Sequence, residues 1–263
     1  MTENTPTKWV LTLLTLLLIL STSYSASAKQ LDAAVGWTKP PYIIAESNSG
    51  FELELVGKVM ASIGHSIKPI YVPYGRSYRM LKNGQVDITL TLSEKAGIPE
   101  NQLSDVYITY QNVVISLKEN QLTINHLSDL QHYSVVAFQN ARILLGSEYA
   151  SNIERNSAYI ELPIQRNQVE MLLQGNTEVV VMDINIFNHL SRELTGSSQM
   201  DNIDVHNLFP LNHYRVAFND LQLRYEFNKA LGSFLASEAY QELVSKYKLY
   251  PTSNYHQLTM VGS

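Results

Sequence analysis

The apolar residues follow two alternating spacings, short runs typical of strands and the three-to-four spacing typical of helices. A first series predicts strands at 31–36, 67–72 and 86–92, with helices at 50–64 and 76–82. A second series predicts strands at 133–138, 159–162 and 179–182, with helices at 141–149 and 165–174. Strands that alternate with helices in this way predict an α/β fold with parallel sheets.

The two series resemble each other at one point in particular. Residues 80–87 and 171–178 each combine a helix end, a glycine and the entry into a buried strand. Because the two stretches occupy matching places, we expect two similar lobes. Extended strands near 112–117 and 214–218 are the predicted connections between them.

The tail from 220 to 250 is predicted to be helical. Asp220 precedes the apolar stripe Phe227, Leu231, Phe234 and Leu235, and its carboxylate can accept bonds from free backbone N–H groups. Ser237 and Glu238 are expected to begin a second helix.

Residues 1–28 have the pattern of a signal peptide. Lys8 precedes an apolar run at 9–20, and Ala26, Ser27 and Ala28 form a small-residue cleavage site. The alternative is an uncleaved anchor, although a bilayer span needs about 20 apolar residues. The mature chain is therefore expected to begin near Lys29 and to be exported to the periplasm. The chain has no cysteine, so it carries no lipid-modified N-terminal cysteine.

Composition narrows the possible functions. The net charge of -5, without a basic block, disfavours nucleic-acid binding. The absence of cysteine excludes disulfides, thiolate catalysis and cysteine-based zinc sites. Sixteen tyrosines suit partly wet binding surfaces, because each joins an apolar ring to a polar tip.

Motifs of common cofactor and metal enzymes are missing. The sequence contains no GxGxxG, P-loop, GxSxG or HExxH, and its seven histidines are scattered. We therefore expect no cofactor, no metal site and no catalytic residue.

A series of short motifs extends along almost the whole mature chain. They are Pro40-Pro41-Tyr42, Gly50-Phe51-Glu52-Leu53-Glu54-Leu55, Pro73-Tyr74-Gly75-Arg76, Ser104-Asp105-Val106-Tyr107, Leu127-Ser128-Asp129-Leu130, the strand 179–183, Leu223-Arg224, Asn228-Lys229-Ala230-Leu231 and Lys246-Tyr247. In this order the chain resembles the family 3 extracellular solute-binding proteins, the periplasmic components of amino-acid ABC importers.

The resemblance implies a type 2 periplasmic-binding-protein fold, with two βα lobes joined by a two-strand hinge. Lobe 1 would hold residues 29–115 and 215–263, and lobe 2 would hold 116–214. The solute would lie between the lobes, at the carboxyl ends of the strands.

Asp183 ends an apolar strand, and in the family the matching residue pairs with the ligand's α-ammonium. Its alternative role is to cap a helix that starts at Ile184. Trp37 and Tyr42 flank the two prolines and are candidates for a stacking wall, or for core packing.

Arg76 follows Tyr74 at the entry to a predicted helix, where its guanidinium could hold a carboxylate in a bidentate manner. The alternative is a solvated arginine. Glu54 either pairs with Arg76 or faces solvent.

Further candidates lie after strand ends. Thr91 and Ser93 share a strand face with Thr89 and could donate hydroxyl bonds. Lys95 stands near the position of the arginine that clamps the α-carboxylate in the family, but a lysine lacks the planar fork. Backbone N–H groups of Gln139, Asn140 and Ala141, at a helix start, could hold an anion.

These features predict a monomeric periplasmic protein that binds a small polar solute, such as an amino acid, and delivers it to an ABC permease. One alternative is a stand-alone sensor or regulatory module. The other is an enzyme on the same fold, of cyclohexadienyl-dehydratase type, with Glu54 or Asp183 as acid or base.

Overall fold

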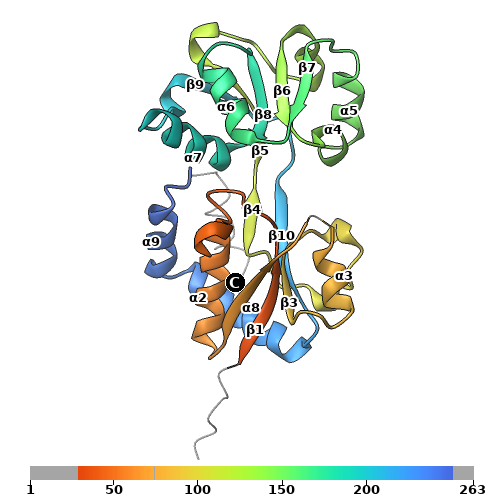
Figure 1. Ribbon diagram of the computed structural model, residues 1–263, viewed down its shortest axis with the longest axis vertical. Helices are drawn as coiled ribbons and strands as arrows, with labels where there is room; N and C mark the ends of the chain where they lie inside the picture. The colour runs from red at the N-terminus through yellow and green to blue at the C-terminus, as the bar shows by residue number, and fades with distance from the viewer. Residues whose placement is uncertain (1–28, 74, 251–263) are drawn as a thin grey trace, which may run out of the picture.

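The computed structural model describes residues 29–73 and 75–250, and in this part of the chain two five-stranded sheets form two lobes (Figure 1). The first sheet has the order β2-β1-β3-β10-β4 and consists of β1 (Gln30–Val35), β2 (Ser66–Tyr71), β3 (Ile88–Leu92), β4 (Ile108–Tyr110) and β10 (Asn212–Phe218). The second has the order β7-β6-β8-β5-β9 and consists of β5 (Asn112–Leu117), β6 (Val135–Phe138), β7 (Tyr159–Leu162), β8 (Val179–Asp183) and β9 (Ile203–His206).

Both sheets share one pairing scheme. In lobe 1, β1 pairs in parallel with β2 and β3, and β10 joins β3 antiparallel. In lobe 2, β6 pairs in parallel with β7 and β8, and β5 joins β8 antiparallel. This confirms the predicted α/β class with two similar units.

Helices accompany both sheets. Lobe 1 contains α2 (Phe51–Ser62), α3 (Ser77–Lys82), α8 (Leu221–Leu235) and α9 (Glu238–Lys246). Lobe 2 contains α4 (Ala141–Leu144), α5 (Ser147–Ile153), α6 (Gln165–Leu173) and α7 (Ile184–Thr195). Short 3-10 turns occur at Ala45–Ser47, Glu94–Ala96, Glu100–Gln102, Lys118–Asn120, Leu127–His132 and Met200–Asn202.

Local sequence signals explain the helix ends. Asp220 caps α8 by accepting from the N–H groups of Gln222 and Leu223, and Ser237 caps α9. The single helix predicted at 141–149 is wrong, because the structure has α4 and α5 there. Gly146 has φ 98°, a conformation that interrupts the helix and that glycine adopts at little cost.

Alternate residues of the central strands enter cores on opposite faces of the sheet. In β1, Leu31 and Val35 pack with the cluster that includes α2 and α8, while Ala34 packs with Leu81 of α3. In β5, Val113 belongs to the cluster that includes α2 and α8, while its neighbour Val114 belongs to a different cluster on the opposite face of the second sheet. The cluster on the α2 side continues through the junction of the lobes into α6 and α7.

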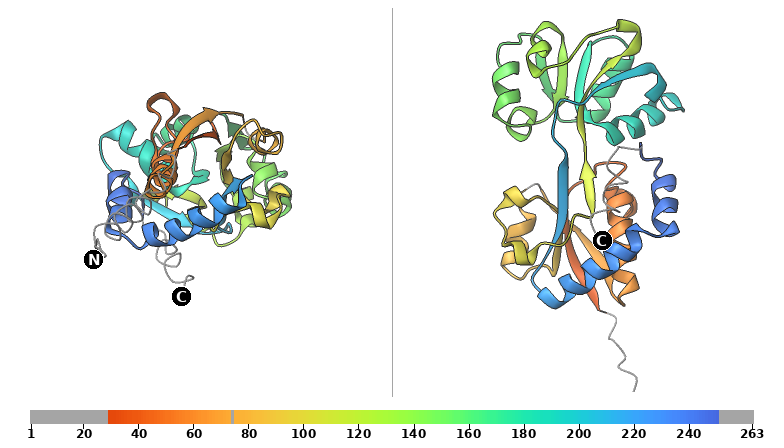
Figure 2. Two further views of the ribbon diagram at one scale, coloured as in Figure 1. Left: turned by 90° about the horizontal axis from the view of Figure 1, so that it is seen from below. Right: turned by 180° about the vertical axis from the view of Figure 1, so that it is seen from behind.

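The chain crosses between the lobes at Gln111 and again between β9 and β10 (Figure 2). Since β5 pairs wholly within the second sheet, the first crossing precedes the predicted boundary at 115/116. The predicted signal peptide, residues 1–28, and Tyr74 lie outside the described residues. No helix in the described part of the chain has the length and apolarity needed to cross a membrane.

The start of α2 depends on a close backbone contact, which two glycine variants test. Gly50 has φ 117°, and an added Cβ would lie 2.3 Å from the Tyr42 carbonyl oxygen. Gly50→Ala should therefore lower the free energy of unfolding by about 2 kcal/mol or more. In Gly57→Ala, the new Cβ would meet Ile67 at 3.8 Å, and removing a glycine from a helix interior should raise stability by about 0.5–1 kcal/mol. Urea unfolding of both variants is the measurement, and equal stability of the two would contradict this packing.

Candidate functional site

Residues from both lobes meet where β1, β3 and β8 reach their carboxyl ends. We call this set the junction cluster; its members are Lys39, Tyr42, Glu52, Thr91, Tyr107, Tyr110, Asp183 and Asn185. The carboxyl ends of parallel strands are the usual ligand-binding edge of open α/β sheets.

Glu52 is a carboxylate with an exposed fraction of 0%. Its Oε1 accepts from the hydroxyls of Thr91 and Tyr107, and its Oε2 accepts from the Tyr110 hydroxyl at 2.6 Å. A buried carboxylate is costly unless donors surround it, and three hydroxyls meet that need here.

Thr91 has φ 58°, which is rare for a β-branched residue. Its N–H donates to the Tyr107 hydroxyl at 3.0 Å, and its own hydroxyl donates to Glu52. Because both bonds hold the strained conformation, Glu52 and Tyr107 determine where Thr91 points. Strained residues held in this way are typical of functional sites.

The two phenols around Glu52 remain protonated. Burial raises the pKa of Tyr107 and of Tyr110 well above their ordinary value, and the charge of Glu52 adds to the increase. They act as hydrogen-bond donors at neutral pH.

Tyr42 connects the lobes. Its ring stacks on Tyr110 with centroids 3.9 Å apart and an interplanar angle of 17°. Its hydroxyl donates to Asp183 Oδ1 at 2.9 Å and accepts from Asn185 Nδ2 at 3.2 Å. The predicted core packing of Tyr42 is therefore present, together with a polar bond across the junction.

Asp183 is 3% exposed and caps α7. Oδ1 accepts from the N–H groups of Asn185 and Ile186 as well as from Tyr42, and Oδ2 accepts from the N–H of Gln111 at 2.9 Å. Burial raises the pKa of Asp183, although these four bonds act in the opposite direction. A ligand cation at Asp183 would have to share or replace one of these donors, so ligand contact stays a prediction.

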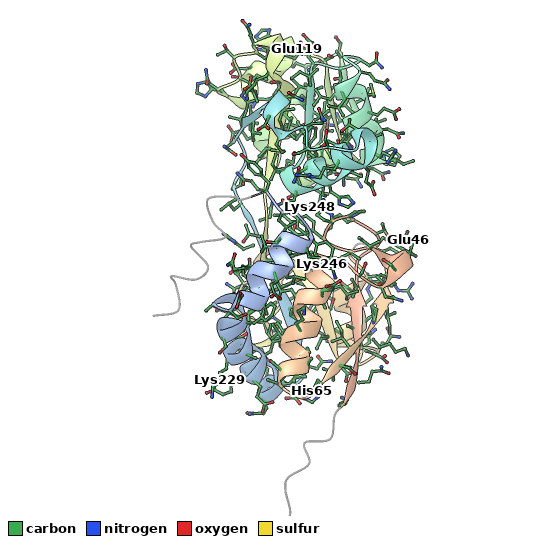
Figure 3. All side chains as sticks on the ribbon, turned by 90° about the vertical axis from the view of Figure 1, so that its left-hand side faces the viewer. Glu46, His65, Glu119, Lys229, Lys246 and Lys248 are labelled. Carbon is green, nitrogen blue, oxygen red and sulfur yellow. The ribbon has the colours of Figure 1, made fainter. Side chains whose placement is uncertain are left out.

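The tail provides another link between the lobes. Asn188 Nδ2 of α7 donates to the Lys248 carbonyl at 2.9 Å, and the N–H of Tyr250 donates to Asn185 Oδ1 at 2.6 Å. Figure 3 shows Lys248 at the level where the two lobes meet. The residues after α9 therefore help to hold α7 against lobe 1.

Lys39 lies beside Tyr110, with Nζ 4.4 Å from the ring centroid. The side chain is half-buried, and burial lowers its pKa, although Glu52 and Asp183 act in the opposite direction. Within residues 29–73 and 75–250, no carboxylate oxygen lies within 4.0 Å of Nζ.

The start of α4 is already occupied by a carboxylate of the chain. Glu161 accepts from the N–H of Asn140 at 2.7 Å, from the N–H of Arg142 at 3.0 Å and from the Tyr159 hydroxyl at 2.8 Å. Burial raises the pKa of Glu161, but these bonds outweigh it and lower the pKa overall. Ala141 is buried between the two bonded N–H groups, and the side chains of Gln139 and Asn140 are exposed.

Glu54 occupies neither of the two positions expected from the sequence. Its carboxylate accepts from Lys246 Nζ at 2.7 Å and from the Tyr247 hydroxyl at 2.6 Å. It therefore joins α2 to α9, where Figure 3 shows Lys246, instead of pairing with Arg76 or facing solvent. Arg76 is exposed just before α3.

The other candidates are distributed as follows. Trp37 is 60% exposed in the loop that leads to Lys39, and Ser93 is half-buried after β3. Tyr74 and the side chain of Lys95 lie outside the part of the chain that the structure describes. Of the predicted residues, Tyr42, Thr91 and Asp183 belong to the junction cluster.

Sequence reasoning missed Lys39, Glu52, Tyr107, Tyr110 and Asn185. For Glu52 a signal existed, since it shares a helix face with Leu55, Val56 and Val59, all of which are buried. A carboxylate on an apolar face predicts a buried, hydrogen-bonded group. Lys39 had no such periodic signal, because it lies in a loop.

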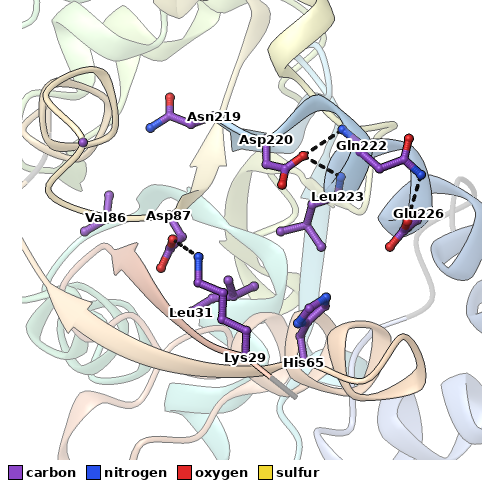
Figure 4. Close-up of a pocket in the computed structure, with 11 residues that line it drawn as sticks. Lys29, Leu31, His65, Val86, Asp87, Asn219, Asp220, Gln222, Leu223 and Glu226 are labelled. Atoms are coloured by element: carbon purple, nitrogen blue, oxygen red, sulfur yellow. Dashed lines mark hydrogen bonds and ion pairs between the residues drawn. The ribbon is translucent and has the colours of Figure 1, made fainter. Parts of the chain in front are cut away.

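A cavity of about 330 Å³ lies elsewhere in lobe 1 (Figure 4). It is lined by Lys29, Leu31, His65, Gly84, Val86, Asp87, Asn219, Asp220, Gln222, Leu223 and Glu226. Lys29 precedes β1 and Asp87 precedes β3, so this cavity lies at the amino ends of the parallel strands, opposite the junction. In the described chain, no group of three or more acidic or histidine side chains could hold a metal ion.

The bond between Tyr42 and Asp183 can be tested by Tyr42→Phe. The variant retains the stacked ring but leaves Asp183 and Asn185 with one partner fewer, so the free energy of unfolding should fall by about 1–2 kcal/mol. Tyr225→Phe, at an exposed position on α8, should change it by less than about 0.5 kcal/mol. Chemical denaturation of both variants is the measurement, and an unchanged Tyr42→Phe protein would refute the contribution of the bond.

The carboxylate of Glu161 should make stability depend on pH. Its pKa is lowered from the ordinary value of 4.5, so its contribution is present above pH 4.5 and is lost as pH falls through the folded-state pKa. Glu161→Gln should lose about 1–2 kcal/mol at pH 7, and the difference from wild type should shrink in acid, where Glu161 is protonated. Glu154→Gln, at an exposed position after α5, is the control. A pH-independent difference would contradict the assignment.

Comparison with solved structures finds similar folds at low sequence identity. A histidine kinase sensor domain with similarity to periplasmic binding proteins has a TM-score of 0.61 and 17% identity, covering 84% of this chain and 98% of that one. The GluR0 ligand-binding core in complex with L-glutamate has a TM-score of 0.64 and 15% identity, covering 84% and 99%. A substrate-binding protein of an ABC uptake transporter from Streptococcus pneumoniae, with bound histidine, has a TM-score of 0.61 and 15% identity, covering 83% of this chain and 92% of that one.

These likenesses show that the fold is that of type 2 periplasmic binding proteins. A sequence comparison with curated proteins finds no match. The model of the bacterial extracellular solute-binding proteins, family 3, matches residues 31–250, which is most of the chain. The protein therefore belongs to family 3 of the bacterial extracellular solute-binding proteins.

Proposed function

We propose that the protein binds a small polar solute between its two lobes and catalyses no reaction. The observation that carries this proposal is the junction cluster, which joins side chains of both lobes where strands of both sheets end. A solute held there would contact both lobes at once, and it would favour the lobe arrangement that it binds best.

The chemistry of the cluster supports binding more than catalysis. The phenols of Tyr107 and Tyr110 stay protonated, and Glu52 is enclosed by three hydroxyls. Glu54, an acid–base candidate for the dehydratase alternative, is engaged by Lys246 and Tyr247. Asp183, the other candidate, is engaged by four donors.

We further propose that residues 1–28 direct the chain to the periplasm, where the protein hands its solute to an ABC permease. Family membership and the amino-acid-bound structures of the same fold support this role. The stand-alone sensor is the second candidate, favoured by the similarity to a histidine kinase sensor domain. Loss of solute uptake when the gene is deleted would distinguish transport from sensing.

Solute binding can be tested by a thermal-shift screen with amino acids, amines, carboxylates and sugars. A solute at 100 times its dissociation constant adds about 2.7 kcal/mol to the free energy of unfolding, which should raise Tm by a few degrees. For a solute that binds, small-angle scattering should show a more compact particle. A screen with no shift, together with unchanged scattering, would refute the proposal.

Asp183→Ala tests whether the cluster is the binding site. Asp220→Ala is its matched control, because both aspartates cap a helix by accepting from two backbone N–H groups and only Asp183 lies at the junction. Asp220→Ala should lose about 1 kcal/mol of stability, and Asp183→Ala should lose more, because it also removes the acceptor of the Tyr42 hydroxyl and of the Gln111 N–H. Only Asp183→Ala should also lose the solute-induced shift, because the bond from Tyr42 to Asp183 joins the lobes at the proposed site. An unchanged shift in Asp183→Ala would place the site elsewhere.

A further inference from the structure

The ammonium of Lys39 retains hydrogen-bonding capacity at the junction. It has three N–H donors, and its contact in the described chain is the ring of Tyr110, at 4.4 Å. The ring attracts the cation but accepts no conventional hydrogen bond. A half-buried ammonium beside an aromatic ring is favourable for an incoming anion, since part of the cost of removing water from the cation has already been met.

The carboxylates near Lys39 have little capacity left for a ligand. Glu52 is inaccessible to solvent and accepts from three hydroxyls. Asp183 accepts from four donors. The hydroxyl and N–H dipoles that point at these carboxylates compensate their charges, which weakens the repulsion of an anion at Lys39.

A ligand ammonium would meet the opposite situation. It would be repelled by Lys39, and the carboxylates that it would need, Asp183 and Glu52, are buried and already accept from four and three donors. At the start of α4, Glu161 likewise takes the N–H groups of Asn140 and Arg142. Of these four charged groups, all in the described part of the chain, Glu52, Asp183 and Glu161 are hydrogen-bonded within the chain, and Lys39 contacts an aromatic ring instead.

Trp37 is an exposed apolar side chain close to Lys39 along the chain. It lies two positions before Lys39 in the same loop, and its large side chain is 60% exposed. An exposed indole offers a flat face against which a ring or an alkyl chain can pack. The loop therefore carries an exposed indole and a cation two positions apart.

We propose that the solute of this protein is an organic carboxylate without an ammonium group, whose carboxylate binds Lys39 and whose flat apolar body packs on Trp37. This inference rests on the solute-binding function proposed above and names the ligand class of that site. Family membership does not determine this class, which follows from the hydrogen-bond capacity that each polar group retains.

Three compounds that share a phenylethyl group test the proposal by isothermal titration calorimetry. 3-Phenylpropionate has the carboxylate, 2-phenylethylamine has the amine, and L-phenylalanine has both groups. We expect 3-phenylpropionate to bind about tenfold or more tightly than L-phenylalanine, a difference of about 1.4 kcal/mol, and the amine to bind most weakly. Tighter binding of L-phenylalanine than of 3-phenylpropionate, or no binding of 3-phenylpropionate, would overturn the inference.

Variants of Lys39 assign the contact. Lys39→Met keeps the length of the side chain and should lose about tenfold or more in affinity for 3-phenylpropionate. Lys39→Arg, which keeps the charge, should stay within a few-fold of wild type. Lys229→Met is the control, because Lys229 is exposed on α8 at the end of lobe 1 away from lobe 2 (Figure 3). Wild-type affinity in Lys39→Met would overturn the assignment.

The outcomes separate this inference from the proposed function. If amino acids bind and compact the particle while 3-phenylpropionate does not, the ligand class is wrong and solute binding stands. If Lys39→Met has a changed circular dichroism spectrum, Lys39→Arg still decides, because it keeps the charge: a loss of about tenfold or more in affinity for 3-phenylpropionate in Lys39→Arg, with wild-type affinity in Lys229→Met, would overturn the role of the charge.

Discussion

The hydrogen bond from the Tyr42 hydroxyl to Asp183 joins the two lobes at the point where both sheets end. Asp183 also caps α7 and accepts from Gln111, the residue at which the chain crosses between the lobes. One buried carboxylate therefore ties together a crossing strand, a helix of lobe 2 and a tyrosine of lobe 1. Because the Tyr42 hydroxyl would lose Asp183 as its partner if the lobes separated at this point, the bond constrains how the lobes are arranged.

Glu52 plays the corresponding part within lobe 1. Its three hydroxyl partners come from the end of β3, from β4 and from the segment before β4, so one carboxylate aligns several elements next to the junction. The stacked pair of Tyr42 and Tyr110 then connects the Glu52 network to Asp183. Buried polar networks of this kind specify one arrangement of the groups that they contain.

The same networks limit what the junction can bind. The carboxylates of Asp183, Glu52 and Glu161 already accept hydrogen bonds from donors of the chain. A solute therefore has to compete with these donors or bind to another polar group. Lys39 is the partner that we propose, since its ammonium is next to a ring and not within ion-pair distance of a described carboxylate. In the binding that we propose, specificity depends on the capacity left on each group, as well as on which residue types are present.

The sequence by itself determined the α/β class, the two series, most strand positions and the caps at Asp220 and Ser237, because periodicity and capping act over a few neighbouring residues. It also indicated Tyr42, Thr91 and Asp183, which end strands or flank a turn. Only the tertiary structure decided their partners. Tyr42 and Asp183 are 141 positions apart, Glu54 and Lys246 are 192 apart, and no local pattern encodes which donor reaches which carboxylate. Those pairings arise when separate sheets and helices pack, since packing alone brings distant side chains within hydrogen-bonding distance.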